Sequence, residues 1–166
     1  MKTTAAEMFD RHAVTVYRYF CRTTASPDLA EDLTQEVFVR VIRGLHRYQP
    51  RDRERSWLFR IVGHVLTDCR EATRADVLQL GEVNEPVHDA WNLTALAYGD
   101  ALRFLSPSDR AVYLLREQVG LSYSEIANVC EMTEQSVRSR LYRARRDIRC
   151  LLSDGRLYDS EDTRGR

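Results

Sequence analysis

The sequence predicts an all-α fold of two small helical domains, and three observations support this prediction. Apolar residues recur at helical spacing along most of the 166 residues. Alternating runs of β-branched residues, and Asn-Gly or Asp-Gly turns between such runs, are missing. Periodicity fades between residues 75 and 93, where Gly81, Pro86 and several acids predict an acidic flexible linker. We therefore expect domains at residues 1–74 and 94–153, and a disordered polar tail at 154–166.

The first domain is predicted to contain three helices. Thr4 and Glu7 form a capping box for a helix that ends near Thr24. A Ser-Pro pair predicts the start of a second helix over residues 27–44, and a third helix follows at 56–73. The residues that these helices are expected to bury are Phe9, Ala13, Val16, Phe20, Leu29, Leu33, Val37, Val41 or Ile42, Leu58, Ile61, Val65 and Cys69.

The second domain is predicted to end in a helix-turn-helix. Residues 93–105 form one expected helix, and a Ser-Pro pair at 106–107 begins another that ends near Gly120. Ser122 and Glu125 then form a capping box for a short helix, and a tight turn follows at 131–133. Thr133 caps the last helix, whose expected buried stripe is Val137, Leu141, Ala144 and Ile148.

The outward face of this last helix is rich in arginine. In a helix-turn-helix, the first residues of the second helix reach base edges in the major groove of DNA. A solvated charged face is the alternative, but the cap, the turn and the apolar stripe together favour DNA binding. We predict that Gln135, Arg138 and Ser139 read bases and that later arginines hold phosphates. The predicted DNA-contacting residues are Gln135, Ser136, Arg138, Ser139, Arg140, Arg143 and Arg146.

The formal net charge is zero, but the charges are segregated along the chain. Residues 40–74 carry nine arginines against four acids, and residues 136–150 carry six arginines against one acid. Between them, residues 75–100 hold five acids and no lysine or arginine. Two basic segments separated by an acidic one therefore suit two contacts with nucleic-acid phosphates, for which arginine is well shaped.

Other functional classes find little support in the sequence. The four cysteines lack the paired spacing of zinc ligands, and we expect buried thiols in a reducing cytosol. No signal peptide is visible, and no apolar run approaches the roughly 18 residues of a membrane span, which predicts a soluble cytoplasmic protein. The histidines lie in unrelated contexts, and no catalytic arrangement or glycine-rich phosphate loop is recognisable. We expect no enzymatic activity, no metal and no cofactor.

Two sequence blocks carry a family resemblance. The first block is Asp32-Leu33-Thr34-Gln35-Glu36-Val37-Phe38, followed by Trp57-Leu58-Phe59-Arg60-Ile61 and Asp68-Cys69-Arg70. The second is Ala101-Leu102 with Leu105-Ser106-Pro107, then Ser122-Tyr123-Ser124-Glu125-Ile126-Ala127, then Val137-Arg138-Ser139-Arg140-Leu141 with Arg143-Ala144-Arg145. In this order and separation, the two blocks resemble bacterial RNA polymerase sigma factors of the extracytoplasmic-function (ECF) group. Many response regulators end in a similar helix-turn-helix, so the first block is the one that distinguishes this family.

The resemblance implies three surfaces. Docking on the largest catalytic subunits of core RNA polymerase would fall on Asp32, Gln35, Glu36 and Arg40. Contacts with the minus-ten promoter element would fall on Tyr48, Arg51, Arg55, Trp57, Arg60, His64, Arg70 and Arg74. The helix-turn-helix would read the minus-thirty-five element. For Trp57, stacking on unpaired bases is one interpretation, and packing within its own domain is the favoured one. The chain departs from the family pattern at two places. Gly63-His64 stands where an Arg-Asn or similar pair is usual, and Arg70-Glu71 stands where a basic pair is usual.

The resulting hypothesis is a promoter-specificity subunit that acts only with core polymerase. The alternative is a stand-alone helix-turn-helix regulator whose first domain serves dimerisation or sensing. If an anti-sigma protein sequesters the chain, that partner must cover the polymerase-docking and promoter surfaces.

Overall fold

The described part of the chain is built from helices. The computed structural model describes residues 4–24, 26–49, 53–77 and 93–153, and these contain no strand. The elements are α1 (Ala5–Thr24), α2 (Pro27–Gly44), the short 3-10 helix η1 (Leu45–Arg47), α3 (Glu54–Val77), α4 (Leu93–Phe104), α5 (Pro107–Glu117), α6 (Tyr123–Val129) and α7 (Glu134–Ser153). The all-α prediction is confirmed. The predicted tail, and most of the predicted linker, lie outside the described residues.

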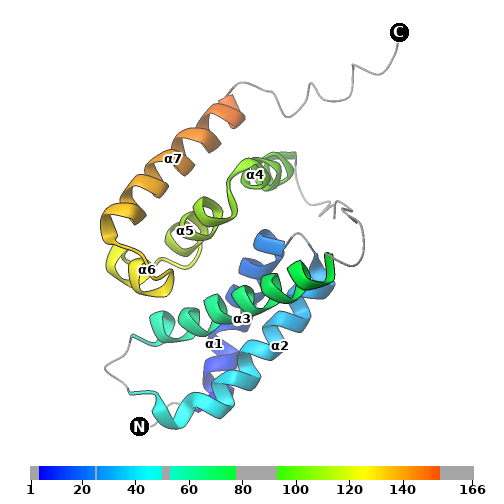
Figure 1. Cartoon of the computed structure of the whole chain (residues 1–166), viewed down its shortest axis with the longest axis vertical. Coiled ribbons are helices and arrows are strands. Elements are labelled where there is room, and N and C mark those ends of the chain that lie inside the picture. Colours follow the sequence, from blue (N-terminus) through cyan, green and yellow to red (C-terminus); the bar gives the residue numbers. More distant parts are fainter. Residues whose placement is uncertain (1–3, 25, 50–52, 78–92, 154–166) are drawn as a thin grey trace.

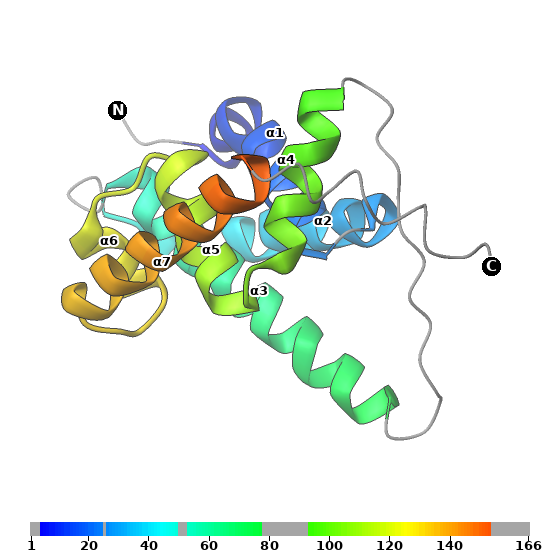
Figure 2. The same cartoon turned by 90° about the horizontal axis from the view of Figure 1, so that it is seen from above.

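The helices form two groups, which Figures 1 and 2 show from two directions. In the first group α1 packs along α2, and α3 packs against α2. In the second group α7 contacts α4, α5 and α6. The two groups also touch, because α3 contacts α6 and α1 contacts α5. The helix-turn-helix therefore lies directly beside the helix that carries the predicted minus-ten residues.

Side-chain caps set the helix starts as the sequence predicts. The Glu125 backbone N–H donates to Ser122 Oγ at 3.3 Å, while the Ser122 N–H donates to Glu125 Oε2 at 2.8 Å. Thr4 and Glu7 exchange the equivalent pair of bonds before α1. Such reciprocal bonds satisfy backbone donors that have no partner within the helix. Ser26 and Ser106 cap α2 and α5, each followed by a proline in the first turn.

The buried residues correct part of the predicted core. The stripe of α7 is confirmed, since Val137, Leu141, Ala144 and Ile148 are all buried. On α1, Phe9 is instead 50% exposed, and it meets Phe38 of α2 edge to face with the ring centroids 4.8 Å apart. Met8 is buried instead, while Val16 and Phe20 of the predicted stripe are buried as expected.

One open choice on α2 is settled, and two further differences concern α3 and the thiols. Val41 is buried, so Ile42, the other residue considered for that core position, is 65% exposed. The third helix begins two residues earlier and ends four residues later than expected. None of the four cysteines is buried as expected: Cys150 is exposed, and Cys21, Cys69 and Cys130 are half-buried. The burial of Cys130 raises the pKa of its thiol to about 11.

Within the described ranges, no helix is long and apolar enough to cross a membrane. The same residues contain no group of three or more His, Cys, Asp or Glu side chains placed to hold a metal ion.

Candidate nucleic-acid interface

The turn between α6 and α7 contains a residue in the left-handed conformation and a threonine that caps α7. Glu131 has φ = 52°, a conformation that is uncommon outside glycine and that reverses the chain after α6. The Met132 N–H donates to the Ala127 carbonyl at 3.0 Å. Thr133 Oγ1 then accepts from the Ser136 N–H at 3.1 Å and so caps α7. The turn thereby fixes the direction in which α7 leaves α6.

Burial of one stripe of α7 leaves its opposite face open to solvent. Arg138, the predicted base reader, has 67% of its side chain exposed. The exposed members of the predicted set are Gln135, Arg138, Ser139, Arg143 and Arg146, while Ser136 and Arg140 are half-buried. The predicted contact residues therefore share one accessible surface, as reading of a DNA groove requires.

Asp109 of α5 holds two arginines of this surface in place. Its Oδ1 accepts from Arg140 at 2.9 Å and from Arg143 at 3.4 Å. Burial alone raises the pKa of Asp109, but hydrogen bonds from Arg140 and Ser106 and the charge of Arg143 outweigh it and hold the pKa below the ordinary value. The ionised carboxylate thus restricts the orientation of both guanidinium groups.

Two further arginines of α7 have acidic partners within the chain. Arg145 binds Glu117 of α5 with two nitrogens, at 2.6 and 3.1 Å from the same carboxylate oxygen. Arg146 makes a similar pair of bonds with Asp147, at 2.7 and 2.9 Å. These partners offset part of the positive charge, so this face of α7 is less basic than its number of arginines indicates.

Two tyrosines that are not among the predicted DNA-contacting residues lie beside them. The ring of Tyr123 is faced by the guanidinium carbons of Arg116 at 5.2 Å and Arg138 at 5.8 Å, which is cation–π geometry. Tyr142 is 70% exposed. Spacing could have indicated Tyr142, because it lies four residues after Arg138 on the same helix face. The contact of Tyr123 with Arg138 needed the angle between α6 and α7.

The aromatic pair of the predicted minus-ten surface lies at the start of α3. The rings of Tyr48 and Trp57 have centroids 5.1 Å apart with an interplanar angle of 56°. Trp57 is half-buried, and a Cβ at Gly44 would lie 3.7 Å from its Cζ2. Trp57 thus packs within its own group of helices, as the favoured interpretation expected, and keeps part of its ring accessible.

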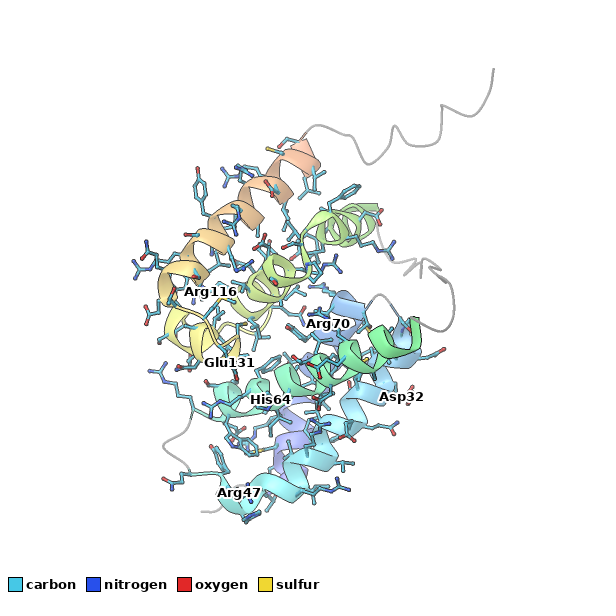
Figure 3. The ribbon with its side chains drawn as sticks, viewed as in Figure 1. Asp32, Arg47, His64, Arg70, Arg116 and Glu131 are labelled. Atoms are coloured by element: carbon cyan, nitrogen blue, oxygen red, sulfur yellow. The ribbon has the colours of Figure 1, made fainter. Side chains whose placement is uncertain are left out.

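The basic residues of α3 lie on the side that faces the second group of helices or solvent. Arg60, His64 and Arg70 are exposed, and Figure 3 shows His64 and Arg70 along the border with the second group. Arg55 donates to the Val119 carbonyl at 3.2 Å. Arg51 and the side chain of Arg74 lie outside the described residues.

The predicted docking face lies on α2, well away from the helix-turn-helix (Figure 3). Asp32 and Gln35 are exposed, and the exposed apolar residues Val39 and Ile42 continue the same helix face. Glu36 accepts from Arg40 Nε at 2.6 Å, and another Arg40 nitrogen donates to Asp68 of α3 at 2.7 Å. Arg40 therefore bridges α2 to α3, and Asp32 and Gln35 present the open polar groups.

A pH dependence follows from the two carboxylates of the second group. Burial raises the pKa of Glu125, but bonds from Ser122 and Arg53 outweigh it and hold the pKa below the ordinary 4.5. The pKa of Asp109 is likewise below its ordinary 3.8. The stability that each carboxylate contributes is thus complete at neutral pH and is lost as the pH falls below these values.

We expect the melting temperature followed by circular dichroism to fall across that acidic range. The double variant Asp109→Asn, Glu125→Gln keeps the side-chain shapes but cannot titrate, so its melting temperature should start lower and change less with pH. Equal pH dependence of the variant and the wild type would show that these two carboxylates do not cause the loss of stability in acid.

Comparison with known families identifies the chain. Residues 8–75 match the family model described as Sigma-70 region 2, and residues 95–148 match the one described as Sigma-70, region 4. The helices and the exposed surfaces thus define a DNA-binding protein of the sigma-70 type. SigL of Mycobacterium tuberculosis, named an ECF RNA polymerase sigma factor, is 31% identical over 155 residues, which cover 89% of this chain and 88% of SigL. The chain belongs to the family of ECF RNA polymerase sigma factors.

A further relative agrees with this family, and two solved structures share the fold. BldN of Streptomyces coelicolor, also named an ECF sigma factor, is 34% identical over 158 residues. These residues are 89% of this chain but only 60% of BldN, so the chain spans about 60% of that relative's length. The sigma factor RpoE of Bartonella quintana, solved with the anti-sigma factor NepR, has a TM-score of 0.77 at 22% identity, over 89% of this chain and 96% of RpoE. CnrH, solved with the cytosolic domain of CnrY, has a TM-score of 0.66 at 25% identity, over 90% of this chain and 88% of CnrH.

Proposed function

We propose that this chain is an alternative sigma factor that binds core RNA polymerase and directs initiation at promoters with defined minus-ten and minus-thirty-five elements. The observation that carries the proposal is the pairing of two separate exposed surfaces on one chain. One is the arginine-bearing face of α7, and the other is the acidic and apolar face of α2. A stand-alone regulator needs the first surface but not the second, and the match of residues 8–75 to region 2 favours the sigma factor.

The docking face suits a basic partner with some apolar surface. Asp32 and Gln35 offer a carboxylate and an amide, and Ile42 offers an exposed aliphatic side chain on the same side of α2. Such a mixture of apolar and hydrogen-bonding groups is typical of protein interfaces. We assign this face to the largest catalytic subunits of core polymerase, with Asp32 and Gln35 in direct contact, Glu36 beside them, and Arg40 supporting Glu36.

Promoter contacts are assigned to both groups of helices. The basic residues of α3 would hold the minus-ten region, with the Tyr48–Trp57 pair beside the unpaired bases. The face of α7 would read the minus-thirty-five element in the major groove. The function requires no catalytic chemistry, metal or cofactor from this chain, and it places the protein in the cytoplasm. An anti-sigma partner, such as the NepR bound to RpoE, would regulate it by covering these surfaces.

A direct test compares binding with and without polymerase. Core enzyme and purified chain, alone and together, would be mixed with sheared genomic DNA of the source cell, and the retained fragments sequenced. We expect enrichment of fragments that share two spaced elements only when both proteins are present. Enrichment of palindromic sites by the chain alone would support the regulator instead.

Arg138 offers a test of base reading. Removal of one good side-chain contact with a base edge costs about 1–3 kcal/mol at that base pair. We expect Arg138→Ala to lose that discrimination at one position of the upstream element, measured by holoenzyme binding to a panel of single-base variants. Arg149→Ala, which removes an exposed arginine near the end of the same helix, should weaken all members of the panel alike. A uniform loss for Arg138→Ala would reassign Arg138 to phosphate contact.

A further inference from the structure

Tyr123 lies where three helices of the second group meet. It is the first residue of α6, and its ring is half-buried. The guanidinium carbon of Arg116 from α5 lies 5.2 Å from the ring centroid, and that of Arg138 from α7 lies 5.8 Å from it. Arg145 of α7 donates to Glu117 and to the Tyr123 hydroxyl, and these bonds outweigh burial and raise the pKa of its guanidinium. One side chain of α6 thus contacts both neighbouring helices.

Arg116 is fixed on the side of α5, at the junction that Figure 3 shows. One of its terminal nitrogens donates to the Leu121 carbonyl at 2.8 Å, in the segment that leads from α5 to α6. Leu121 is itself buried, and its N–H donates to the Leu115 carbonyl at 3.0 Å. The ring of Tyr123 therefore lies against a guanidinium that is anchored to the core of the domain.

Arg138 is held only weakly by its own helix. A carboxylate oxygen of Glu134, one turn earlier in α7, lies 4.0 Å from an Arg138 nitrogen, and both side chains are exposed. Exposed pairs of this kind contribute little, because water screens the charges and side-chain entropy opposes the contact. Within the described residues, Tyr123 supplies the contact of Arg138 with another helix. The orientation of Arg138 relative to the domain thus depends on this ring.

An aromatic ring restrains an arginine differently from a carboxylate. The other arginines of α7 with partners on α5 are bound by carboxylates, and they are Arg140, Arg143 and Arg145. A carboxylate offsets the charge of a guanidinium and occupies its N–H donors. A ring attracts the cation through its quadrupole and needs no N–H donor. Tyr123 therefore orients Arg138 and leaves its N–H groups available for guanine O6 and N7, the acceptors that arginine reads in the major groove.

We propose that Tyr123 determines promoter specificity indirectly, by holding Arg138 in the orientation in which it reads a base edge. The proposal rests on the function proposed above and gives Tyr123 a positioning role, without contact to the base. Without the ring, the Arg138 side chain samples more rotamers, and the fraction that is ready to bind the correct base falls. The apparent affinity for the correct base pair falls with that fraction, whereas affinity for the wrong base pairs changes little.

Two variants of Tyr123 separate its ring from its hydroxyl. Tyr123→Leu removes the ring, and Tyr123→Phe keeps the ring but removes the hydroxyl that meets Arg145. Tyr98→Leu is the matched control, because it removes a tyrosine of α4 whose ring centroid lies 5.4 Å from the guanidinium carbon of Arg22 in α1. Circular dichroism checks the helicity of each variant. If Tyr123→Leu does not fold, Tyr123→Met supplies a second variant without a ring, since methionine adapts to irregular spaces.

Holoenzyme binding to the panel of single-base variants of the upstream element measures the effect. We expect Tyr123→Leu to lower discrimination at the base pair read by Arg138 about two- to fivefold, the strength of one exposed cation–π contact. Tyr123→Phe should keep the discrimination of wild type, and so should Tyr98→Leu. Uniform weakening across the panel by Tyr123→Leu, or an equal loss of discrimination in Tyr123→Phe, would overturn the proposal.

A double-mutant cycle shows whether Tyr123 acts through Arg138. In the Arg138→Ala background, Tyr123→Leu should cause no further loss of discrimination, because the group that the ring positions is already gone. A loss of the same size in both backgrounds would mean that Tyr123 contacts the DNA by itself, which contradicts the proposal.

The positioning role and the proposed function can fail separately. In the free chain, the Nε–H resonance of Arg138, assigned by its absence in Arg138→Ala, should move in Tyr123→Leu because the ring current is lost. It should stay in place in Tyr98→Leu. If wild type with core polymerase shows no promoter-directed binding, the assignment as a sigma factor fails, whatever the resonance does. If wild type discriminates among the panel and Tyr123→Leu discriminates equally well, only the positioning role fails.

Discussion

Reversal of the charge at Asp32 should strongly weaken the binding of the chain to core RNA polymerase. In the double variant Asp32→Arg, Gln35→Ala, a cation replaces the exposed carboxylate and the neighbouring amide is lost. Like charges placed opposite each other at an interface cost several kcal/mol. We expect affinity for core polymerase to fall at least about 100-fold, or about 2.8 kcal/mol, in an equilibrium binding assay.

A control with the same charge change separates docking from general electrostatics. Asp10→Arg alters an exposed acid of α1 by the same two charge units, and we expect polymerase binding close to that of wild type. Both variants should keep the helicity of the parent, because the substituted side chains are exposed. Normal co-elution of the Asp32→Arg, Gln35→Ala chain with core enzyme would falsify the docking assignment.

Truncation of Leu141 should produce the largest loss of stability in the helix-turn-helix domain. Leu141 is 1% exposed and lies in the middle of the buried stripe of α7. Leu→Ala changes in such positions cost about 2–5 kcal/mol, since transfer free energy is lost and a cavity is left. That cost is a large share of the roughly 5–15 kcal/mol by which a folded domain is stable. Chemical denaturation followed by circular dichroism measures it.

Leu152 provides the control on the same helix. It is among the exposed large hydrophobic residues, so Leu152→Ala should change the free energy of unfolding by no more than about 0.5 kcal/mol. We also expect Leu141→Ala to weaken recognition of the upstream element, because Arg138 and Tyr142 lie on the helix that Leu141 anchors. A cost below about 1 kcal/mol for Leu141→Ala would mean that α7 is held by something other than its apolar stripe.

Local chemistry made much of the fold predictable. Ser122 and Glu125 predict a helix start because their reciprocal hydrogen bonds form within one turn and need no distant partner. The α7 stripe was predictable for the same reason, since one helix buries a continuous row of apolar residues. Phe9 was assigned wrongly, because Met8 and Phe9 are both apolar and only the position of α2 decides which one is buried.

Partners that depend on tertiary packing were beyond the reach of the sequence. The bonds of Asp109 to Arg140 and Arg143 join residues more than thirty positions apart, and they depend on the angle at which α7 crosses α5. Arg40 carries a charge that suits docking, but its bond to Asp68 became visible only with α2 and α3 in place. Gly63 was noticed as a departure from the family, but its position beside Val129 of α6 became visible only with the helices packed.

In vitro transcription tests the central claim most directly. Core RNA polymerase and the purified chain, separately and together, would transcribe a template enriched in the genomic binding experiment, with transcript starts mapped by primer extension. The account predicts a discrete start downstream of two spaced elements only in the combined reaction, and its loss with Asp32→Arg, Gln35→Ala. A start produced by core enzyme alone, or no discrete start when both proteins are present, would contradict it.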